Sequence, residues 1–166
     1  MNTAAVLTIS DSASQGKRKD TSGPAIATEL EAAGFQITRI VVVPDERAQI
    51  QQQLIDACGH AQLVVTVGGT GIAVRDVTPE ATLAVVERLI EGIPEKMRIA
   101  GAAKTPLAAL SRGICGVRGK SLILNLPGSP KAAVESLQAV LEILPHALEL
   151  LSGNTEHEDQ ATGHRP

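Results

Sequence analysis

Aromatic side chains are almost absent from this sequence of 166 residues, which contains one Phe, no Trp and no Tyr. The stacking platforms on which single-strand nucleic-acid binders hold bases are therefore missing, and the core must be aliphatic. A net charge of −3 gives no excess of positive charge for nonspecific binding to nucleic acid or to an anionic membrane. No apolar run approaches the roughly 18 residues that a membrane span needs. We therefore expect neither nucleic acid nor a membrane as a partner.

Cysteine is scarce as well, because the sequence contains only Cys58 and Cys115. Two cysteines do not supply the paired spacings of a zinc site. They form either one disulfide or two free thiols, and a reducing cell favours the thiols. The N-terminus has no basic segment, and its apolar run is too short for a secretory signal peptide. We therefore expect a cytoplasmic protein.

What the sequence does contain is typical of a soluble globular protein, with 43% hydrophobic and 20% charged residues. Its length corresponds to one domain at roughly 100–200 residues per domain. We expect a single α/β domain over residues 1–151 and a polar, flexible C-terminal tail over residues 152–166. No internal repeat and no linker divides the chain.

Short apolar segments alternate along the chain with segments in which apolar residues recur every three or four positions. The first kind predicts strands over residues 4–10, 35–43, 63–67 and 121–125. The second kind predicts helices over residues 21–34, 45–59, 78–89, from Pro94 onward, and over 129–151 with a kink at Pro145. The segment before residue 121 gives no clear prediction. This alternation predicts a three-layer α/β sandwich, in which helices cover both faces of a mostly parallel central sheet.

Polar or glycine-rich turns follow four of the predicted strands. In a parallel sheet, ligands bind in the crevice at the carboxyl ends of the strands. We therefore expect the four turns to gather on one rim of the sheet. They are Ser10-Asp11-Ser12, Pro44-Asp45-Glu46, Gly68-Gly69-Thr70-Gly71 and Asn125-Leu126-Pro127-Gly128.

The turn Gly68–Gly71 either brings backbone N–H groups close to a phosphate or is a tight turn without a ligand. It matches neither the dinucleotide fingerprint nor the P-loop. Asp76 is either a turn residue or a site carboxylate, and Asp45 is either a helix N-cap or a second one. Their shared rim favours a pair of carboxylates that hold magnesium against nucleotide phosphates. Arg75 pairs either with a phosphate or with Asp76.

The remaining polar motifs are less specific. The basic run Lys17-Arg18-Lys19 is either a solvated loop or a positively charged lip for an anionic ligand. The segment 157–161 begins like a zinc-protease motif, but Ala161 stands where the second His is needed. No serine lies in a G-x-S-x-G elbow, so the sequence gives no support for a hydrolase.

Seven motifs occur in a fixed order and together span residues 4–150. They are Thr8-Ile9-Ser10-Asp11-Ser12, Asp20 with Ser22-Gly23, Pro44-Asp45-Glu46, Gly68-Gly69-Thr70-Gly71, Arg75-Asp76-Val77-Thr78-Pro79-Glu80-Ala81, Leu110-Ser111-Arg112 and Leu126-Pro127-Gly128-Ser129-Pro130-Lys131-Ala132. This series resembles the MogA/MoaB family of molybdenum-cofactor biosynthesis proteins. Some MoaB-type relatives lack both aspartate segments, whereas this chain keeps both.

The resemblance implies a molybdopterin adenylyltransferase, a magnesium-dependent nucleotidyltransferase. Its substrates are ATP and molybdopterin, and it releases pyrophosphate. The family's two essential aspartates fall on Asp45 and Asp76, which we expect to be catalytic and to bind Mg. The substrate-binding residues expected from position are Ser10, Asp11, Ser12, Gly68, Gly69, Thr70, Gly71, Arg75, Thr78, Pro79, Ser111, Arg112, Asn125, Pro127, Gly128 and Ser129.

The same resemblance implies a homotrimer, with a hexamer as the alternative, and a handover of product to a molybdate-inserting protein. Two other functions stay open. One is a noncatalytic molybdopterin carrier or scaffold protein of the same pathway. The other is a generic nucleotide-binding or pyrophosphatase-like α/β domain.

Overall fold

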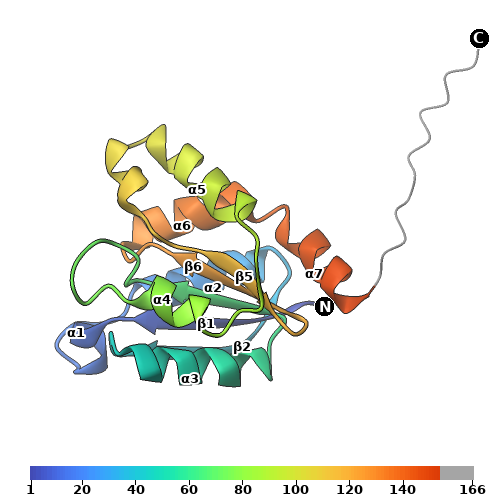
Figure 1. Ribbon diagram of the computed structural model, residues 1–166, viewed down its shortest axis with the longest axis horizontal. Coiled ribbons are helices and arrows are strands. Elements are labelled where there is room, and N and C mark those ends of the chain that lie inside the picture. Colours follow the sequence, from blue (N-terminus) through green and yellow to red (C-terminus); the bar gives the residue numbers. More distant parts are fainter. Residues whose placement is uncertain (154–166) are drawn as a thin grey trace, which may run out of the picture.

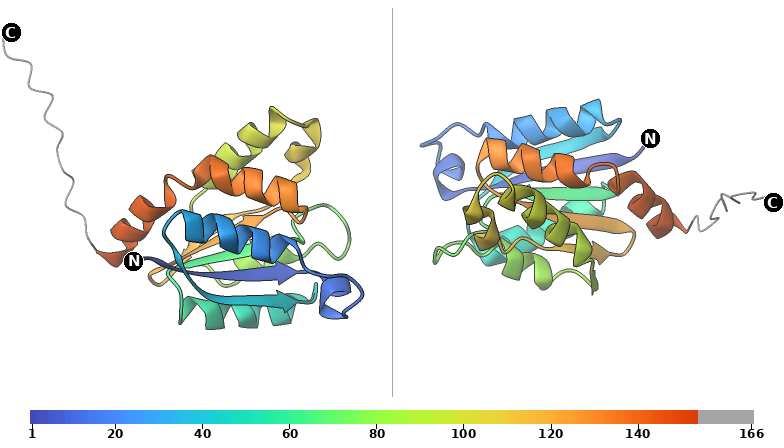
Figure 2. Two further views of the ribbon diagram at one scale, coloured as in Figure 1. Left: turned by 180° about the vertical axis from the view of Figure 1, so that it is seen from behind. Right: turned by 90° about the horizontal axis from the view of Figure 1, so that it is seen from above.

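A six-stranded sheet forms the middle layer of the protein, in the order β2-β1-β3-β6-β5-β4. The computed structural model describes residues 1–153 and places helices on both faces of this sheet (Figures 1 and 2). The strands are β1 (Thr3–Ile9), β2 (Gln36–Val43), β3 (Leu63–Val67), β4 (Arg88–Leu89), β5 (Cys115–Arg118) and β6 (Ser121–Leu126). The helices are α1 (Asp11–Ser14), α2 (Ser22–Ala32), α3 (Arg47–Cys58), α4 (Thr78–Leu83), α5 (Gly92–Ala102), the 3-10 helix η1 (Pro106–Leu110), α6 (Pro130–Val140) and α7 (Leu144–Ser152).

The predicted α/β sandwich is confirmed, because β1, β2, β3 and β6 pair in parallel while β4 and β5 are antiparallel. One hydrophobic core lies under α2, α5, α6 and α7, and the other lies under α3 and α4. Along β1, Ala4 and Val6 enter the first core, whereas Ala5 and Leu7 enter the second. Successive side chains of a strand point to opposite faces, so a strand buried on both faces has a continuous apolar sequence.

Three segments differ from the sequence expectations. The short helix α1 follows β1, where the sequence predicts a loop. The helix predicted over residues 78–89 ends at Leu83, and the chain then forms the edge strand β4, which pairs antiparallel with β5. The segment without a clear prediction contains η1 and β5.

The helix predicted over residues 129–151 is divided into α6 and α7. In a continuous helix the nitrogen of Pro145 would face the carbonyl of Leu141, but it has no hydrogen to donate and its ring clashes there. Helix α6 therefore ends at Val140, and Pro145 lies in the first turn of α7, where no helical donor is needed. The predicted kink is corrected to a break, and both helices still pack into the same core.

Both cysteines are free thiols, Cys58 half-buried and Cys115 buried. Burial raises the pKa of the Cys115 thiol to about 12, so this side chain stays neutral inside the core. The tail predicted over residues 152–166 lies outside the described residues from position 154 onward. Across residues 1–153, none of the helices has both the length and the apolar character that spanning a membrane would take.

The side chain of Asn125, at the end of β6, is completely buried between the sheet and α4. Its Nδ2 donates to the hydroxyl oxygens of Thr66 and Thr82, each at 2.9 Å, and its Oδ1 accepts from the N–H of Ile114 at 3.1 Å. Both groups of the amide are thus engaged inside the protein. The side chain therefore holds the sheet to α4, and the expected role of Asn125 in substrate binding stays a prediction.

Replacing Asn125 with Ala should lower the free energy of unfolding by about 2–4 kcal/mol, because the change opens a cavity and leaves buried polar groups without partners. The exposed Gln52, in α3, provides the control, and Gln52→Ala should change stability by less than about 0.5 kcal/mol. Urea unfolding followed by circular dichroism measures both, because the chain has no Trp or Tyr. Equal stability of the two variants would contradict the role assigned to Asn125.

Candidate functional site

The four turns expected on one rim do lie together at the carboxyl edge of the parallel strands. Strand register aligns Ile9 with Val43, and Val67 with Leu126, so the segments that leave these strands emerge side by side. In Figure 1 this edge carries α1 and the green loop before α4, while the N-terminus lies at the opposite edge.

Two cavities open on this rim. The first, of about 350 Å³, is lined by Asp45, Asp76 and the starts of α2 and α6, and we call it the carboxylate pocket. The second, of about 450 Å³, lies among α5, η1 and α6, and we call it the helical pocket. Gly69, Asp76 and Gly128 line both, so a ligand in one pocket can touch a ligand in the other at these three residues.

Asp45 is held in the carboxylate pocket by a reciprocal pair of hydrogen bonds with Asp11. The N–H of Asp11 donates to Oδ2 of Asp45 at 2.8 Å, and the N–H of Asp45 donates to Oδ1 of Asp11 at 3.0 Å. These bonds connect the ends of β1 and β2. The N-cap of α3 is Glu46, so Asp45 is not the cap that the alternative interpretation proposed. Its Oδ1 accepts no hydrogen bond from the described residues.

Arg75 stabilises the pairing of Asp11 with Asp45 through hydrogen bonds from its guanidinium. Its guanidinium donates two hydrogen bonds to the Asp11 carboxylate, at 2.7 and 3.1 Å, and one to Glu46 at 2.9 Å. The bonds from Arg75 hold the pKa of Asp11 below its usual range. The partners of Arg75 within the protein are therefore Asp11 and Glu46, which corrects the alternative that it pairs with Asp76. The other alternative, a contact with a phosphate, stays a prediction.

Burial is the largest influence on the pKa of Asp45. Burial raises the pKa of Asp45, the N–H of Asp11 opposes this shift, and the negative charges of Asp11 and Asp76 raise the pKa further. Oδ2 of Asp76 accepts from the N–H of Ala73 at 2.9 Å, while Oδ1 has no partner among residues 1–153. Both aspartates thus line the carboxylate pocket, and each keeps one oxygen without a hydrogen-bond donor among residues 1–153.

Arg112 holds the loop that carries Asp76. Its guanidinium donates to the carbonyls of Gly71 and Asp76, each at 2.7 Å, and pairs with the carboxylate of Glu80. The backbone N–H of Arg112 donates to the carbonyl of Thr70 at 2.8 Å. The guanidinium thus fixes both ends of the loop, and the expectation that Arg112 also holds substrate stays a prediction.

Thr78 fixes the glycine-rich turn rather than capping α4. Its hydroxyl donates to the carbonyl of Gly68 at 2.9 Å, and its N–H donates to the carbonyl of Gly69 at 3.1 Å. Thr78 is buried and is the first residue of α4, whose N-cap is Val77. Positive φ angles at Gly68 and Gly69 allow the turn to pass this close to α4.

The predicted site residues thus divide into those that line one of the two pockets and those that line neither. Those that line the carboxylate pocket are Ser10, Asp45, Gly68, Gly69, Asp76, Gly128 and Ser129. Those that line the helical pocket are Gly69, Thr70, Gly71, Asp76, Ser111, Pro127 and Gly128. Those that line neither are Asp11, Ser12, Arg75, Thr78, Pro79, Arg112 and Asn125.

Sequence reasoning missed most of the helical pocket, including Arg98, Lys104 and Glu135. Arg98 donates to the carbonyl of Gly113 at 3.2 Å, and Lys104 pairs with Glu135 at 3.1 Å. Their signal in the sequence is weak, because charged residues on an amphipathic helix ordinarily face solvent.

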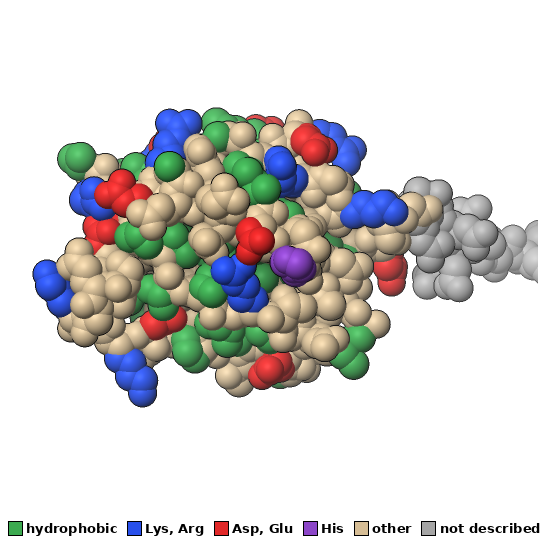
Figure 3. All heavy atoms as spheres, turned by 90° about the horizontal axis from the view of Figure 1, so that it is seen from below, with side chains coloured by type: hydrophobic (Ala, Val, Ile, Leu, Met, Phe, Trp, Pro, Cys, Tyr) green, Lys and Arg blue, Asp and Glu red, His purple; other side chains and the backbone are tan. Residues whose placement is uncertain are grey.

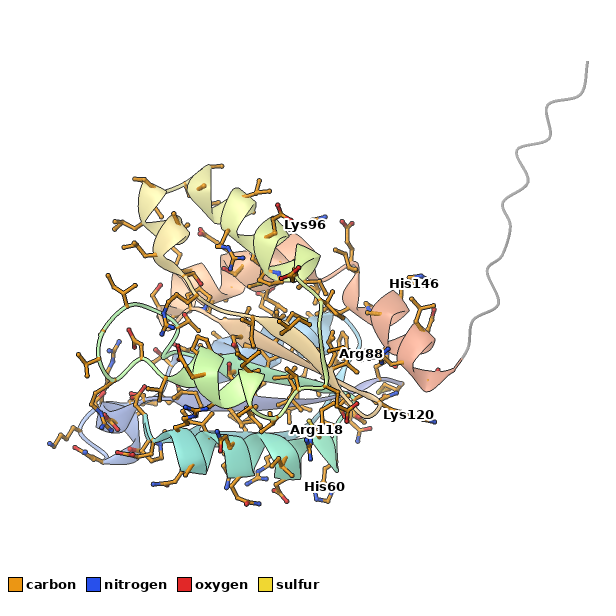
Figure 4. The ribbon with its side chains drawn as sticks, in the orientation of Figure 1. His60, Arg88, Lys96, Arg118, Lys120 and His146 are labelled. Carbon is orange, nitrogen blue, oxygen red and sulfur yellow. The ribbon has the colours of Figure 1, made fainter. Side chains whose placement is uncertain are left out.

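Other charged residues do not form a competing site. His60, Arg88, Arg118, Lys120 and His146 lie away from α1, toward the opposite end of the sheet (Figure 4). The face seen in Figure 3 intersperses basic and acidic side chains instead of gathering one sign. Within the described part of the chain, no group of three or more His, Cys, Asp or Glu side chains could hold a metal ion.

Comparison with known proteins gives concordant matches over nearly the whole chain. Residues 5–146 match the family described as "Probable molybdopterin binding domain". The molybdopterin adenylyltransferase of Helicobacter pylori strain J99 is 44% identical over 153 residues, covering 90% of this chain and 87% of the relative. The Escherichia coli K12 protein of the same name is 40% identical, with 92% and 88% covered. In Drosophila melanogaster, the molybdenum cofactor synthesis protein cinnamon is 45% identical, but the match spans 25% of its length.

Solved structures agree with these matches. MoaB of Thermus thermophilus, described as a molybdopterin biosynthesis enzyme, superimposes with a TM-score of 0.86 at 50% identity, covering 92% of this chain and 98% of that one. The Mog protein of Mycobacterium ulcerans gives a TM-score of 0.85 at 39% identity, with 91% and 99% covered.

Substitutions at Gly69 and Gly34 separate two costs of adding a side chain, which are crowding by neighbouring atoms and the strain of a positive φ. Both glycines have a positive φ, +66° at Gly69 and +87° at Gly34. A Cβ at Gly69 would collide with the Thr78 hydroxyl and lie 3.2 Å from Oδ1 of Asp45, whereas a Cβ at Gly34 would meet nothing within 4 Å. Gly34→Ala should therefore lower the free energy of unfolding by about 1–2 kcal/mol, the cost of this conformation. Gly69→Ala should lower it by about 2–5 kcal/mol, because crowding is added. Circular dichroism during urea unfolding measures both, and equal losses would show that the contact with Thr78 is unimportant.

Proposed function

The chain belongs to the molybdopterin-binding domain family, and from this premise we propose that it is a molybdopterin adenylyltransferase of molybdenum cofactor biosynthesis. The observation that carries the proposal is the placement of Asp45 and Asp76. Both line a pocket bordered by the Gly68–Gly69 turn, and each keeps one carboxylate oxygen without a donor among the described residues. The names of the bacterial relatives agree with this reading.

The reaction transfers AMP from ATP to molybdopterin. An oxygen of the molybdopterin phosphate forms a bond to the α-phosphorus of ATP, and the bond from that phosphorus to the bridging oxygen of the β-phosphate breaks. Pyrophosphate leaves with the electron pair of the broken bond. The attacking phosphate monoester is already ionised near neutral pH, so no side chain needs to remove a proton from it. The chain therefore acts by positioning and charge neutralisation.

We assign the helical pocket to the pterin and the carboxylate pocket to the phosphates of ATP. The helical pocket is the larger of the two and is bordered by apolar side chains such as Met97, Leu107 and Leu110, which suit a flat heterocycle. The carboxylate pocket is bordered by Ser129 and the start of α6, whose helix dipole favours an anion. The α-phosphorus then lies near the three shared residues, Gly69, Asp76 and Gly128.

The two aspartates fit a magnesium ion. Carboxylate oxygens are ligands that Mg²⁺ accepts, and this ion takes one or two of them together with phosphate oxygens and water. Because the charges of Asp11 and Asp76 help to raise the pKa of Asp45, a cation beside these carboxylates would offset their repulsion. When bound, the ion would neutralise charge on the phosphates. The part of this chain is to hold Asp45 through Asp11 and to hold Asp76 through the loop that Arg112 fixes.

The remaining features of the proposal rest on the family resemblance. They are a homotrimer, a cytoplasmic location and a handover of the adenylylated product to a molybdate-inserting protein. A sedimentation measurement of the purified chain tests the first, since a monomer or dimer would contradict it.

Asp45→Ala and Asp76→Ala should each reduce adenylyl-molybdopterin formation by at least about 100-fold, because each removes a charge that aligns the reacting phosphates. The assay combines the purified chain with molybdopterin, ATP and magnesium and follows both adenylyl-molybdopterin and pyrophosphate. Glu31→Ala is the control, because Glu31 is an exposed carboxylate of α2 and its removal should leave the rate unchanged.

Three results would contradict the proposal. Pterin binding without product would make the chain a carrier, and magnesium-dependent release of pyrophosphate without pterin would make it a hydrolase-like domain. Full activity of Asp76→Ala would show that this carboxylate has no part in the transfer. Circular dichroism of each variant separates a loss of activity from a loss of the fold.

A further inference from the structure

The carboxylate pocket has an excess of negative charge for a site that receives phosphates. Its acidic lining residues are Asp20, Asp45 and Asp76, and its basic lining residues are Arg18 and Lys19. Arg75 stands close by, but Asp11 and Glu46 occupy its guanidinium. The phosphate groups of ATP are themselves strongly anionic, so cations are required to offset the repulsion.

Arg18 and Lys19 are free to supply that charge. Neither makes an ion pair or a side-chain hydrogen bond with any of residues 1–153, and both are exposed. Of the basic run in the sequence, Lys17 differs from its two neighbours, because it does not line the pocket.

The backbone on both sides of these two residues is fixed. The N–H groups of Lys17 and Arg18 donate to the carbonyl of Ser12, at 2.9 and 3.2 Å. On the other side, Oδ1 of Asp20 accepts from the N–H groups of Ser22 and Gly23, each at 3.1 Å. Oδ2 of Asp20 accepts from the hydroxyl of Thr8 at 2.8 Å. The two cations are therefore presented from an anchored segment, and Asp20 is engaged in anchoring it.

The positions of the two pockets decide which phosphates these cations meet. Phosphoryl transfer places the attacking oxygen and the leaving oxygen roughly in line on opposite sides of the phosphorus. Under the proposed function, the attacking phosphate belongs to a pterin in the helical pocket. The leaving group must then lie on the far side, in the part of the carboxylate pocket that the helical pocket does not share. Arg18 and Lys19 line the carboxylate pocket alone.

We propose that Arg18 and Lys19 bind the β- and γ-phosphates of ATP and the pyrophosphate that they become. The assignment to a leaving group rests on the proposed function. When the bond from the α-phosphorus to the bridging oxygen breaks, its electron pair stays on pyrophosphate, and the two cations offset that added charge. They are therefore specificity residues for a polyphosphate and not for the pterin.

The direct test is calorimetric binding of inorganic pyrophosphate, in the presence of magnesium chloride and without pterin, to the full chain and to charge-neutral variants. Arg18→Gln and Lys19→Gln should each weaken binding by about 5- to 10-fold, the loss typical of one charge-assisted hydrogen bond at a partly exposed site. The double variant should lose more than either single one. Lys17→Gln is the matched control and should change the affinity by less than about twofold. Arg18→Lys should retain most of the affinity, because it keeps the charge.

Kinetics supply the second readout. In the adenylation assay, Arg18→Gln and Lys19→Gln should raise KM for ATP by about 5- to 10-fold and leave KM for molybdopterin unchanged. A higher salt concentration should reduce the difference in KM for ATP between these variants and wild type, because salt screens the attraction between exposed charges.

The outcomes separate the two ideas. The inference is overturned if wild type does not bind pyrophosphate, or if the Arg18 and Lys19 variants bind it as Lys17→Gln does. The proposed function is judged independently, by whether wild type forms adenylyl-molybdopterin. If wild type forms no such product but binds pyrophosphate through Arg18 and Lys19, the polyphosphate site stands and the transferase assignment falls.

Discussion

The rim of this protein depends on the backbone hydrogen bonds that hold two carboxylates, Asp45 and Asp76, at one pocket. These aspartates come from different parts of the chain, and burial, followed by the charges of Asp11 and Asp76, raises the pKa of Asp45. A flexible rim would relax by turning one of them toward water. Here one oxygen of each accepts a hydrogen bond from a backbone N–H, that of Asp11 or of Ala73, which fixes both carboxylates at the pocket lining.

Two arginines keep that arrangement in place from different sides. Arg75 joins the ends of β1 and β2 through Asp11 and Glu46 in an exposed cluster, where salt screens each ion pair. Arg112 donates to two backbone carbonyls of the Asp76 loop from a half-buried position. Hydrogen bonds to carbonyls are less sensitive to salt than exposed ion pairs, so Arg112 is the more permanent support.

The sequence predicted the fold and the gathering of four turns on one rim because both follow from short-range patterns. Apolar runs buried on two faces give parallel strands, and parallel strands bring their polar turns together. The sequence could not separate residues that line a pocket from residues that hold the lining. Asn125 and Arg112 belong to the same motifs as true lining residues, yet their side chains bond to Thr66 and to Gly71. Only tertiary contacts, which no local pattern encodes, decide which way such a side chain points.

The same limitation applies to the basic run Lys17-Arg18-Lys19. Its three cations are equivalent in the sequence, but Arg18 and Lys19 line the carboxylate pocket and Lys17 does not. Asp20 fixes the chain directly after this run. Its carboxylate bonds to Thr8, Ser22 and Gly23, which draws the chain back to the rim immediately after Lys19. Arg18 and Lys19 line the pocket and Lys17 does not, although the N–H groups of Lys17 and Arg18 both donate to the carbonyl of Ser12. An acidic side chain at the pocket therefore serves the binding of anions indirectly, because it anchors the segment that carries two cations.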